Sequence, residues 1–267
     1  MEIDSLEIQL LARRKRMSRQ NPYEQTILGE ALRGEKYEQF YAMMKKYSFR
    51  LFLRDLLEQP EKVHVEQLTK YCSLRVAQNY LDSLQRLEIV DADREGYCHV
   101  RNPFVPNFGR TLEWYVAEVL QREFGATSRF CITFHNGSTG GDYDVLAAWL
   151  GRLVYVEVKS APPKGIDIHQ VKTFLGRIWD LLPDIAIFFN DTHLRMKDKI
   201  VALFEEEIAR RYGREGLIKY RVQRLEDELF HVNHCLYIVN SKREIAHNFH
   251  VCLSDYLANE LNQKGMP

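Results

Sequence analysis

The sequence predicts an α/β (α+β) protein, in which a sheet domain with flanking helices follows a mostly α domain. Two observations support this class. Apolar residues recur every three or four positions over much of residues 49–87, which is the spacing of helices. From residue 109 onward, short apolar runs alternate with helical stretches in the order α-β-β-β-α-β-α. We expect an N-terminal helical arm at 1–47, a second domain at 48–106 and the sheet domain at 107–267.

Composition excludes several classes of protein. Hydrophobic residues make up 45% and charged residues 28% of the 267 positions, as in ordinary soluble domains. The formal net charge is zero, so any attraction to nucleic acid must come from local patches. The five cysteines are scattered without a CxxC pair, which favours reduced thiols and a cytoplasmic location. No apolar run approaches the ~18–20 residues that span a membrane, so we expect no membrane partner.

The N-terminal arm carries a basic run, Arg13–Arg16. Pro22 should end any helix that precedes it. A second helix is expected at about Tyr23–Tyr47, weakened by Gly29 and Gly34. The basic run either contacts phosphate or is a solvated helix end or partner-docking arm.

Residues 48–106 contain three helical stretches. The first is strongly apolar and ends near Pro60, and the second, His64–Cys72, is short. Ser73 is a good N-cap for the third, Leu74–Leu87. The apolar face of this third helix contains Leu74, Ala77, Tyr80, Leu81, Leu84 and Leu87.

Two short apolar segments, Ile89–Val90 and Tyr97–Val100, surround a turn and are typical of a β-wing. This order of elements resembles winged helix-turn-helix domains, in which the third helix enters the major groove of DNA. The resemblance implies DNA contact by Arg75, Gln78, Asn79 and Arg86. The wing tip, Asp91–Gly96, is acidic and would repel phosphate, so binding to protein alone is an equal alternative.

The sheet domain is organised around a hairpin. Two apolar runs, Tyr143–Trp149 and Leu153–Val158, flank the pair Leu150-Gly151. Glycine tolerates a positive φ and therefore suits the second position of a two-residue hairpin turn. The apolar character of both strands predicts a sheet that is buried on both faces.

This hairpin places four charged residues on one face. Asp144 faces Glu157, and Asp142 faces Lys159. Directly paired Cβ atoms lie roughly 5 Å apart, so two carboxylates could share one cation. Neighbouring buried carboxylates resist ionisation, and the hard cation Mg²⁺ relieves their repulsion. The alternative is a salt-bridged hairpin, Asp142 with Lys159, and a solvated Glu157.

Asp144, followed after twelve residues by Glu157-Val158-Lys159, resembles the PD-(D/E)xK nuclease superfamily. The resemblance covers about Gly109–Gly213 and implies a restriction-endonuclease-like fold, a mixed central sheet flanked by helices. It implies that Mg²⁺ or Mn²⁺ is held by Asp144, Glu157 and the Val158 carbonyl. Lys159 would position the attacking water and stabilise the charge that builds on the phosphate.

Three further residues are candidates for this site. Glu113 lies on the apolar face of the first helix and matches a glutamate that the superfamily often places near the metal. Its alternative is a buried salt bridge, for which Lys159 is the candidate partner. Asp142 could steady Lys159 or bind a second metal ion, and Gln170 on the following helix could orient water or phosphate.

The C-terminal histidines have a spacing that superficially suits zinc, His231-x2-His234 and His247-x2-His250. We expect one strand over Leu229–Val239, and on a strand positions i and i+3 face opposite sides. His231 and His234 should therefore not converge, and we expect ordinary histidines rather than a zinc site.

The function expected from these features is metal-dependent endonuclease activity on duplex or single-stranded DNA, in defence against foreign DNA or in DNA repair. Cutting both strands usually needs two sites, so we expect a homodimer. The alternative is a non-catalytic DNA- or protein-binding regulator with the same fold. The intact set Asp144, Glu157 and Lys159 argues against a regulator, and the acidic wing argues partly for it. A third alternative is an RNase or a nuclease for single strands.

Overall fold

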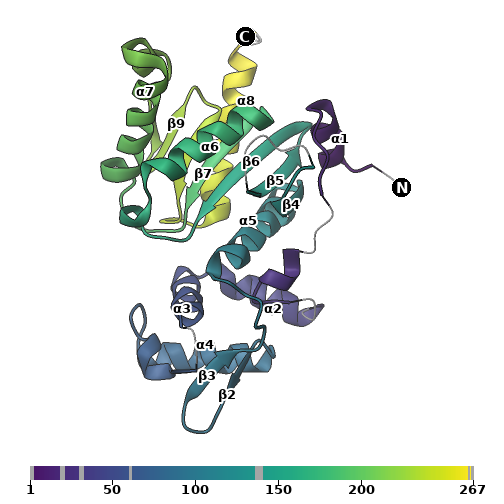
Figure 1. Ribbon diagram of the computed structural model, residues 1–267, viewed down its shortest axis with the longest axis vertical. Coiled ribbons are helices and arrows are strands. Elements are labelled where there is room, and N and C mark those ends of the chain that lie inside the picture. The colour runs from purple at the N-terminus through teal and green to yellow at the C-terminus, as the bar shows by residue number, and fades with distance from the viewer. Residues whose placement is uncertain are drawn as a thin grey trace. The chain divides into compact units, whose positions relative to one another are not determined.

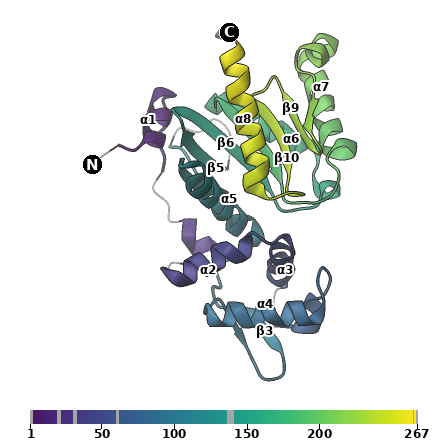
Figure 2. The ribbon, with the colours of Figure 1, turned by 180° about the vertical axis from the view of Figure 1, so that it is seen from behind.

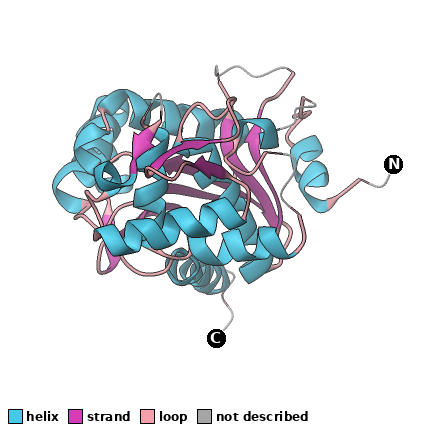
Figure 3. Cartoon of the chain, turned by 90° about the horizontal axis from the view of Figure 1, so that it is seen from below, coloured by secondary structure: helices cyan, strands magenta, loops and turns pink. Residues whose placement is uncertain are grey.

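The computed structural model describes residues 3–18, 22–29, 33–59, 62–135, 141–263 and 265. Two compact units form. One comprises Met1–Arg19 with Val116–Pro267, and the other comprises Gln20–Tyr115. Figure 1 labels the elements along the chain, and Figure 3 separates helices from strands by colour.

The larger unit contains a seven-stranded sheet in the order β4-β5-β6-β7-β10-β9-β8. The strands are β4 (Thr127–Ile132), β5 (Tyr143–Trp149), β6 (Arg152–Lys159), β7 (Ile185–Asn190), β8 (Gln223–Glu226), β9 (Leu229–Val232) and β10 (Leu236–Asn240). β7 pairs in parallel with β6 and β10, and every other neighbouring pair is antiparallel. The predicted α+β class with a mixed sheet is confirmed.

Helices lie on both faces of this sheet. They are α1 (Ser5–Ala12), α6 (Ile168–Leu181), α7 (Ala202–Lys219), α8 (Ile245–Gln263) and α5 (Phe108–Phe124), the last shared by the two units. α6 and α7 cover the face seen in Figure 1, and α8 covers the face seen in Figure 2. Neighbouring side chains of β7 divide between these layers, because Phe188 packs on Phe204 of α7 and Phe189 packs on Phe249 of α8.

The β5–β6 hairpin has the predicted register from Trp149↔Arg152 to Val145↔Val156. Its turn uses positive φ at both central residues, 49° at Leu150 and 75° at Gly151, which is the geometry of a type I′ turn. Leucine is an unusual residue for the first of these positions, and its side chain is exposed. The register therefore comes from the apolar runs together with Gly151.

The N-terminal arm differs from the expectation. The predicted helix at Tyr23–Tyr47 is wrong in its first half, where the chain forms a 3₁₀ helix, η1 (Pro22–Gln25). Gly29 and Gly34 both have positive φ, which an α-helix does not allow, so α2 is confined to Glu35–Met44.

Two members of the basic run are held by carboxylates of the larger unit. Arg13 pairs with Asp184 at 2.8 Å, and Lys15 pairs with Asp180 at 2.6 Å. α1 itself contributes apolar side chains to the core cluster of the sheet. These contacts dock the segment on its own unit.

The smaller unit has the element order expected for residues 48–106. It contains α3 (Tyr47–Leu57), β1 (Val63–His64), η2 (Val65–Leu68), α4 (Leu74–Arg86), β2 (Val90–Ala92) and β3 (Tyr97–Val100), with the strands in the order β1-β3-β2. The predicted second helix is shorter than expected, a single 3₁₀ turn. Ser73 caps α4 as predicted, since its hydroxyl accepts from the Val76 N–H at 3.4 Å. Leu74 is 46% exposed, so its assignment to the apolar face is wrong; the buried stripe begins one turn later, at Ala77.

The C-terminal part also differs. The predicted strand Leu229–Val239 is two strands, β9 and β10, because Asn233 and His234 adopt φ of 52° and 55° and reverse the chain. The edge strand β8 was not predicted. A π-helical turn, Lys197–Val201, precedes α7, which continues to Lys219.

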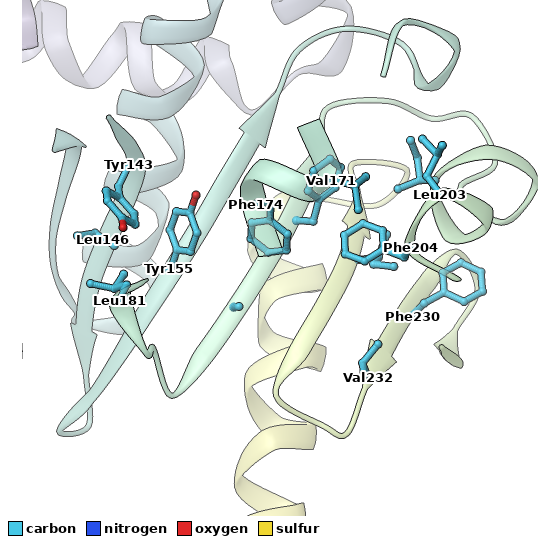
Figure 4. Close-up of a cluster of buried hydrophobic side chains, with 14 of the residues drawn as sticks. Tyr143, Leu146, Tyr155, Val171, Phe174, Leu181, Leu203, Phe204, Phe230 and Val232 are labelled. Atoms are coloured by element: carbon cyan, nitrogen blue, oxygen red, sulfur yellow. The ribbon is translucent and has the colours of Figure 1, made fainter. Parts of the chain in front are cut away.

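A row of aromatic rings forms the core between the hairpin and α6 (Figure 4). Tyr143 contacts Tyr155 with ring centroids 5.2 Å apart, and Tyr155 contacts Phe174 at 5.5 Å. Such edge and tilted contacts stabilise aromatic clusters beyond simple burial. They fix the ring of Tyr155, whose hydroxyl group leaves this cluster toward Glu157.

The structure bears on two expectations drawn from composition, the state of the cysteines and the presence of membrane-spanning helices. All five cysteines are free thiols. Among the residues that the structure describes, no helix is long and apolar enough to cross a membrane.

Candidate active site

Four charged side chains meet where β5, β6 and α6 come together. Asp144 comes from β5, Glu157 and Lys159 from β6, and Arg177 from α6. Glu157, Arg177 and Asp144 are 3%, 9% and 10% exposed as side chains, whereas Lys159 is 17% exposed. Charged groups are rarely buried this far without partners, so the contacts among them decide what the cluster can do.

Glu157 is the centre of the network. Its Oε1 accepts from Lys159 Nζ at 2.7 Å, and its Oε2 accepts from Arg177 Nη1 at 2.9 Å. The Tyr155 hydroxyl donates to Oε2 as well. Burial opposes ionisation of Glu157, but the charges of Lys159 and Arg177 outweigh it, so the pKa of Glu157 is lowered. The same pairing raises the pKa of Lys159 against the effect of burial. Both groups are therefore charged at neutral pH.

Asp144 has a different environment. Its Oδ2 accepts from the Val158 N–H at 2.7 Å, and its Oδ1 lies 4.0 Å from Arg177 Nη1. Burial, followed by the negative charge of Glu157, raises the pKa of Asp144 to about 7. The site thus combines one firmly ionised carboxylate with a second that resists ionisation, a pattern common at functional sites.

Arg177 is the member of this cluster that the sequence interpretation missed. In the sequence, Ile168, Val171, Leu175, Ile178 and Leu182 have the spacing of an apolar stripe. The buried positions are instead Val171, Phe174, Arg177 and Leu181, and Leu182 is 60% exposed. Phe174, Arg177 and Leu181 are spaced i, i+3 and i+7, so a stripe drawn through Phe174 would have revealed an arginine at a core position.

Two accessory candidates have other contacts. Asp142 accepts from the Cys131 thiol at 3.3 Å, while the ion pair of Lys159 is with Glu157. The Gln170 side chain accepts from the Asp167 N–H at 3.1 Å and forms the capping box that starts α6. This contact explains Gln170 as a helix-starting residue, and its role toward water or phosphate stays a prediction.

Glu113 is 7% exposed and lies on α5, in the part of the helix that belongs to the smaller unit. It accepts from Arg110 Nη1 at 2.9 Å, so the buried salt bridge is with Arg110. Its place near a metal ion stays a prediction.

The donor set of the cluster fits a hard divalent cation. Two carboxylates and a neighbouring backbone carbonyl, that of Val158, are the oxygen ligands that Mg²⁺ and Mn²⁺ prefer. The contacts of Arg177 support this fit, because a single guanidinium nitrogen lies 2.9 Å from Glu157 and 4.0 Å from Asp144. The space between the two carboxylates thus accommodates positive charge.

The predicted DNA-contacting face of α4 is open to solvent. Arg75, Gln78, Asn79 and Arg86 are all exposed. In the acidic wing, Asp91 pairs with Arg101 at 2.7 Å, which offsets part of the negative charge. These four side chains are therefore accessible, and their contact with DNA stays a prediction.

The histidines converge, contrary to the expectation. His231 and His234 have ring centroids 4.0 Å apart, because the turn after β9 replaces the straight strand on which they would point apart. His234 Nδ1 lies 2.9 Å from a carboxylate oxygen of Asp255, and His231 Nδ1 accepts from the His234 N–H at 3.2 Å. Tyr237 donates to Asp255 at 2.8 Å. These contacts clamp the β9–β10 hairpin to α8.

This cluster is also a possible metal-binding group. Within the described ranges, His231, His234 and Asp255 offer ligand atoms that lie within 4.8 Å of one another. The Nδ1 atom of each histidine already takes part in a hydrogen bond, which gives the cluster a structural explanation without zinc. His247 and His250 are exposed on α8, and His247 contacts Arg243 at 3.0 Å.

Comparison with known proteins gives a fold but no family. No protein-family model matches the chain, and no curated protein sequence matches it. The structure is similar to that of protein VC1899 from Vibrio cholerae, with a TM-score of 0.52 and 16% identity over 95% of this chain and 62% of VC1899. It also matches Can2 from Sulfobacillus thermosulfidooxidans, solved in complex with cyclic tetra-adenylate, with a TM-score of 0.47 and 12% identity over 94% of this chain and 60% of Can2.

The chain thus spans about three fifths of the length of each of these proteins. The likeness to VC1899 shows a shared fold. At this identity the function has to be argued from the site itself.

Proposed function

We propose that the chain is a metal-dependent endonuclease that hydrolyses phosphodiester bonds in DNA, of the PD-(D/E)xK type. The observation that carries the proposal is the buried network of Asp144, Glu157 and Lys159, with Lys159 Nζ 2.7 Å from Glu157. Two adjacent buried carboxylates destabilise the fold unless positive charge compensates them. A scaffold that only binds other molecules does not require this set.

In this proposal Asp144, Glu157 and the Val158 carbonyl hold Mg²⁺ or Mn²⁺. The bound ion would neutralise charge on the scissile phosphate and lower the pKa of a coordinated water. Lys159 is the most exposed member of the cluster and would hold the attacking water while stabilising the developing negative charge. The Tyr155 hydroxyl keeps the Glu157 carboxylate in place.

The test is cleavage of supercoiled plasmid, linear duplex, single-stranded DNA and RNA with Mg²⁺, Mn²⁺ or EDTA. Glu157→Gln and Lys159→Ala should strongly reduce the rate of cutting, and EDTA should do the same to the wild type. Lys172→Ala is the matched control, because Lys172 is an exposed lysine on α6. If no substrate is cut and calorimetry detects no Mn²⁺ binding, the non-catalytic regulator becomes the better description.

DNA contact by α4 is tested separately. A triple variant of Arg75, Gln78 and Asn79 to alanine should weaken duplex binding in a gel-shift assay, since all three side chains are exposed on one helix. Lys36→Ala, on α2, controls for loss of a positive charge elsewhere in the same unit. Unchanged binding of the triple variant would assign α4 to a protein partner.

Double-strand cutting would require two copies of the site, so the proposal includes a homodimer. Light scattering of the protein bound to duplex DNA should give the mass of two chains, and a single chain would restrict the activity to one strand. Such an activity would serve defence against foreign DNA or DNA repair.

A further inference from the structure

Arg177 is buried at the candidate site although it lies outside the motif formed by Asp144, Glu157 and Lys159. It is 7% exposed, and its guanidinium lies 5.5 Å from the ring centroid of Tyr143. Its Nε atom is buried and has no hydrogen-bond partner among the residues that the structure describes. Burial of an arginine destabilises a protein unless its charge is compensated, so its ion pair with Glu157 must provide most of that compensation.

The backbone beside Arg177 makes room for the guanidinium. A Cβ atom at Gly141 would lie 2.9 Å from Arg177 Nη2, closer than such contacts normally come. Gly141 also has φ of +85°, a conformation that other residues rarely adopt. The absence of a side chain at this position therefore allows Arg177 to reach the carboxylates.

The charges of the cluster balance without a metal ion. Glu157 gives one oxygen to Lys159 and the other to Arg177, and Arg177 Nη1 also lies 4.0 Å from Asp144 Oδ1. A divalent ion added to this arrangement would place two further positive charges in a space already occupied by a guanidinium. Like charges at such distances in a partly desolvated site repel strongly. The ion and Arg177 therefore compete for the same oxygen, Glu157 Oε2.

We propose that Arg177 is a resident counter-cation, so that a divalent metal ion binds between Asp144 and Glu157 only after the guanidinium has left Glu157. This inference rests on the proposed function. The fraction of molecules in which Arg177 has left sets the apparent metal affinity, as for any ligand that selects a minor conformation. The released guanidinium is then free to bind a phosphate oxygen of the substrate, which it can do through two parallel hydrogen bonds.

The test is calorimetric titration of the nucleic-acid-free protein with Mn²⁺. Arg177→Gln should bind Mn²⁺ about tenfold more tightly than the wild type, the coupling expected when a competing group is removed. Arg211→Gln is the matched control, because Arg211 also pairs with a buried glutamate, Glu207, on a different helix. It should leave the affinity unchanged, and Glu157→Gln should abolish binding.

The outcomes separate this inference from the proposed function. Mn²⁺ binding that depends on Glu157 but is equal or weaker in Arg177→Gln overturns the inference and leaves the nuclease standing. No binding by the wild type or by Arg177→Gln overturns both. If Arg177→Gln fails to show a cooperative thermal transition, Arg177→Lys replaces it. A single amine cannot reproduce the guanidinium's contacts, so this variant should also bind Mn²⁺ more tightly than the wild type, and equal or weaker binding counts against the inference.

Discussion

Two buried glutamates in the larger unit, Glu157 on β6 and Glu207 on α7, are each held by two basic side chains. They are 2% and 1% exposed. The partners are Lys159 and Arg177 for Glu157, and Arg210 and Arg211 for Glu207. The pKa of both carboxyls is lowered, that of Glu207 to about 2, chiefly by the hydrogen bond from Arg210. By burial and charge alone the two groups look alike.

Their surroundings differ. The partners of Glu207 follow it by three and four residues on the same helix, a local arrangement that stabilises α7. The partners of Glu157 lie on two elements, β6 and α6. A second carboxylate, Asp144, lies so close that the charge of Glu157 adds to burial in raising the pKa of Asp144. Both sets balance their charges, but the Glu157 cluster gathers its groups from β5, β6 and α6 and contains a second buried carboxylate, which packing does not require. The comparison therefore distinguishes a candidate site from a helix-stabilising pair.

The largest expected effect is on cleavage. Glu157→Gln should lower the rate by on the order of a thousandfold, because it removes a carboxylate proposed to act at the reacting phosphate. Glu207→Gln should leave the rate within about twofold once folding is matched. The measurement is initial rate on the preferred substrate at a temperature where both variants are folded. Equal losses in the two variants would contradict the distinction.

Asp144 predicts a pH dependence of stability that Glu207 does not share. Its pKa rises from 3.8 to about 7 on folding, so the folded state binds more protons than the unfolded state between these values. The contribution of Asp144 therefore favours folding at low pH and is lost as pH rises toward 7, by at most about 4 kcal/mol. Asp144→Asn stays neutral, and its amide oxygen can still accept from the Val158 N–H.

The prediction is that the two proteins have similar unfolding free energies at pH 4.5, and that the asparagine variant becomes the more stable as pH approaches 7.5. Urea unfolding in EDTA across this range measures the difference. Parallel curves for wild type and Asp144→Asn would show that Asp144 ionises normally in the folded protein.

Glu207 should affect stability instead of cleavage. Glu207→Gln loses charge-assisted hydrogen bonds from Arg210 and Arg211 and should lower the free energy of unfolding by about 1–3 kcal/mol at pH 7. The control is Glu205→Gln, an exposed glutamate on the same helix. A loss no larger than that of Glu205→Gln would show that the ion pairs of Glu207 contribute little.

The contrast between local contacts, as at Glu207, and long-range contacts, as at Glu157, also explains which parts of the molecule could be predicted from the sequence. The hairpin register followed from apolar runs around a glycine, and it brings Asp144, Glu157 and Lys159 together. Local rules also identified Ser73 as the cap of α4. These features depend on residues that are close in sequence, where periodicity and turn chemistry operate.

The features that were missed depend on distant contacts or on unusual backbone geometry. Arg177 reaches Glu157 across twenty positions, so only tertiary packing shows that it is buried. The pairing of His231 with His234 requires two consecutive non-glycine residues at positive φ, which propensity does not anticipate. Residues 111–120 of α5 are buried on every side, so periodicity could not separate an inner face that includes Glu113 from an outer face that includes Glu118.

The smallest expected effect concerns Tyr155, which donates to Glu157. Among the described residues, no tyrosine donates to Glu207. Tyr155→Phe keeps the ring that packs on Tyr143 and Phe174 but removes the hydroxyl that donates to Glu157. The free energy of unfolding at pH 7 should fall by about 1 kcal/mol, and cleavage should fall several-fold because the carboxylate is less firmly oriented.

Since the pKa of Glu157 is lowered by folding, its ionised form stabilises the protein at neutral pH, and this stabilisation is lost as pH falls through that pKa. The stability difference between wild type and Tyr155→Phe should accordingly shrink once the pH falls through the lowered pKa of Glu157. Tyr212→Phe on α7 is the control. A loss of stability that persists unchanged when the pH falls through the pKa of Glu157 would assign the hydroxyl to the core instead of to Glu157.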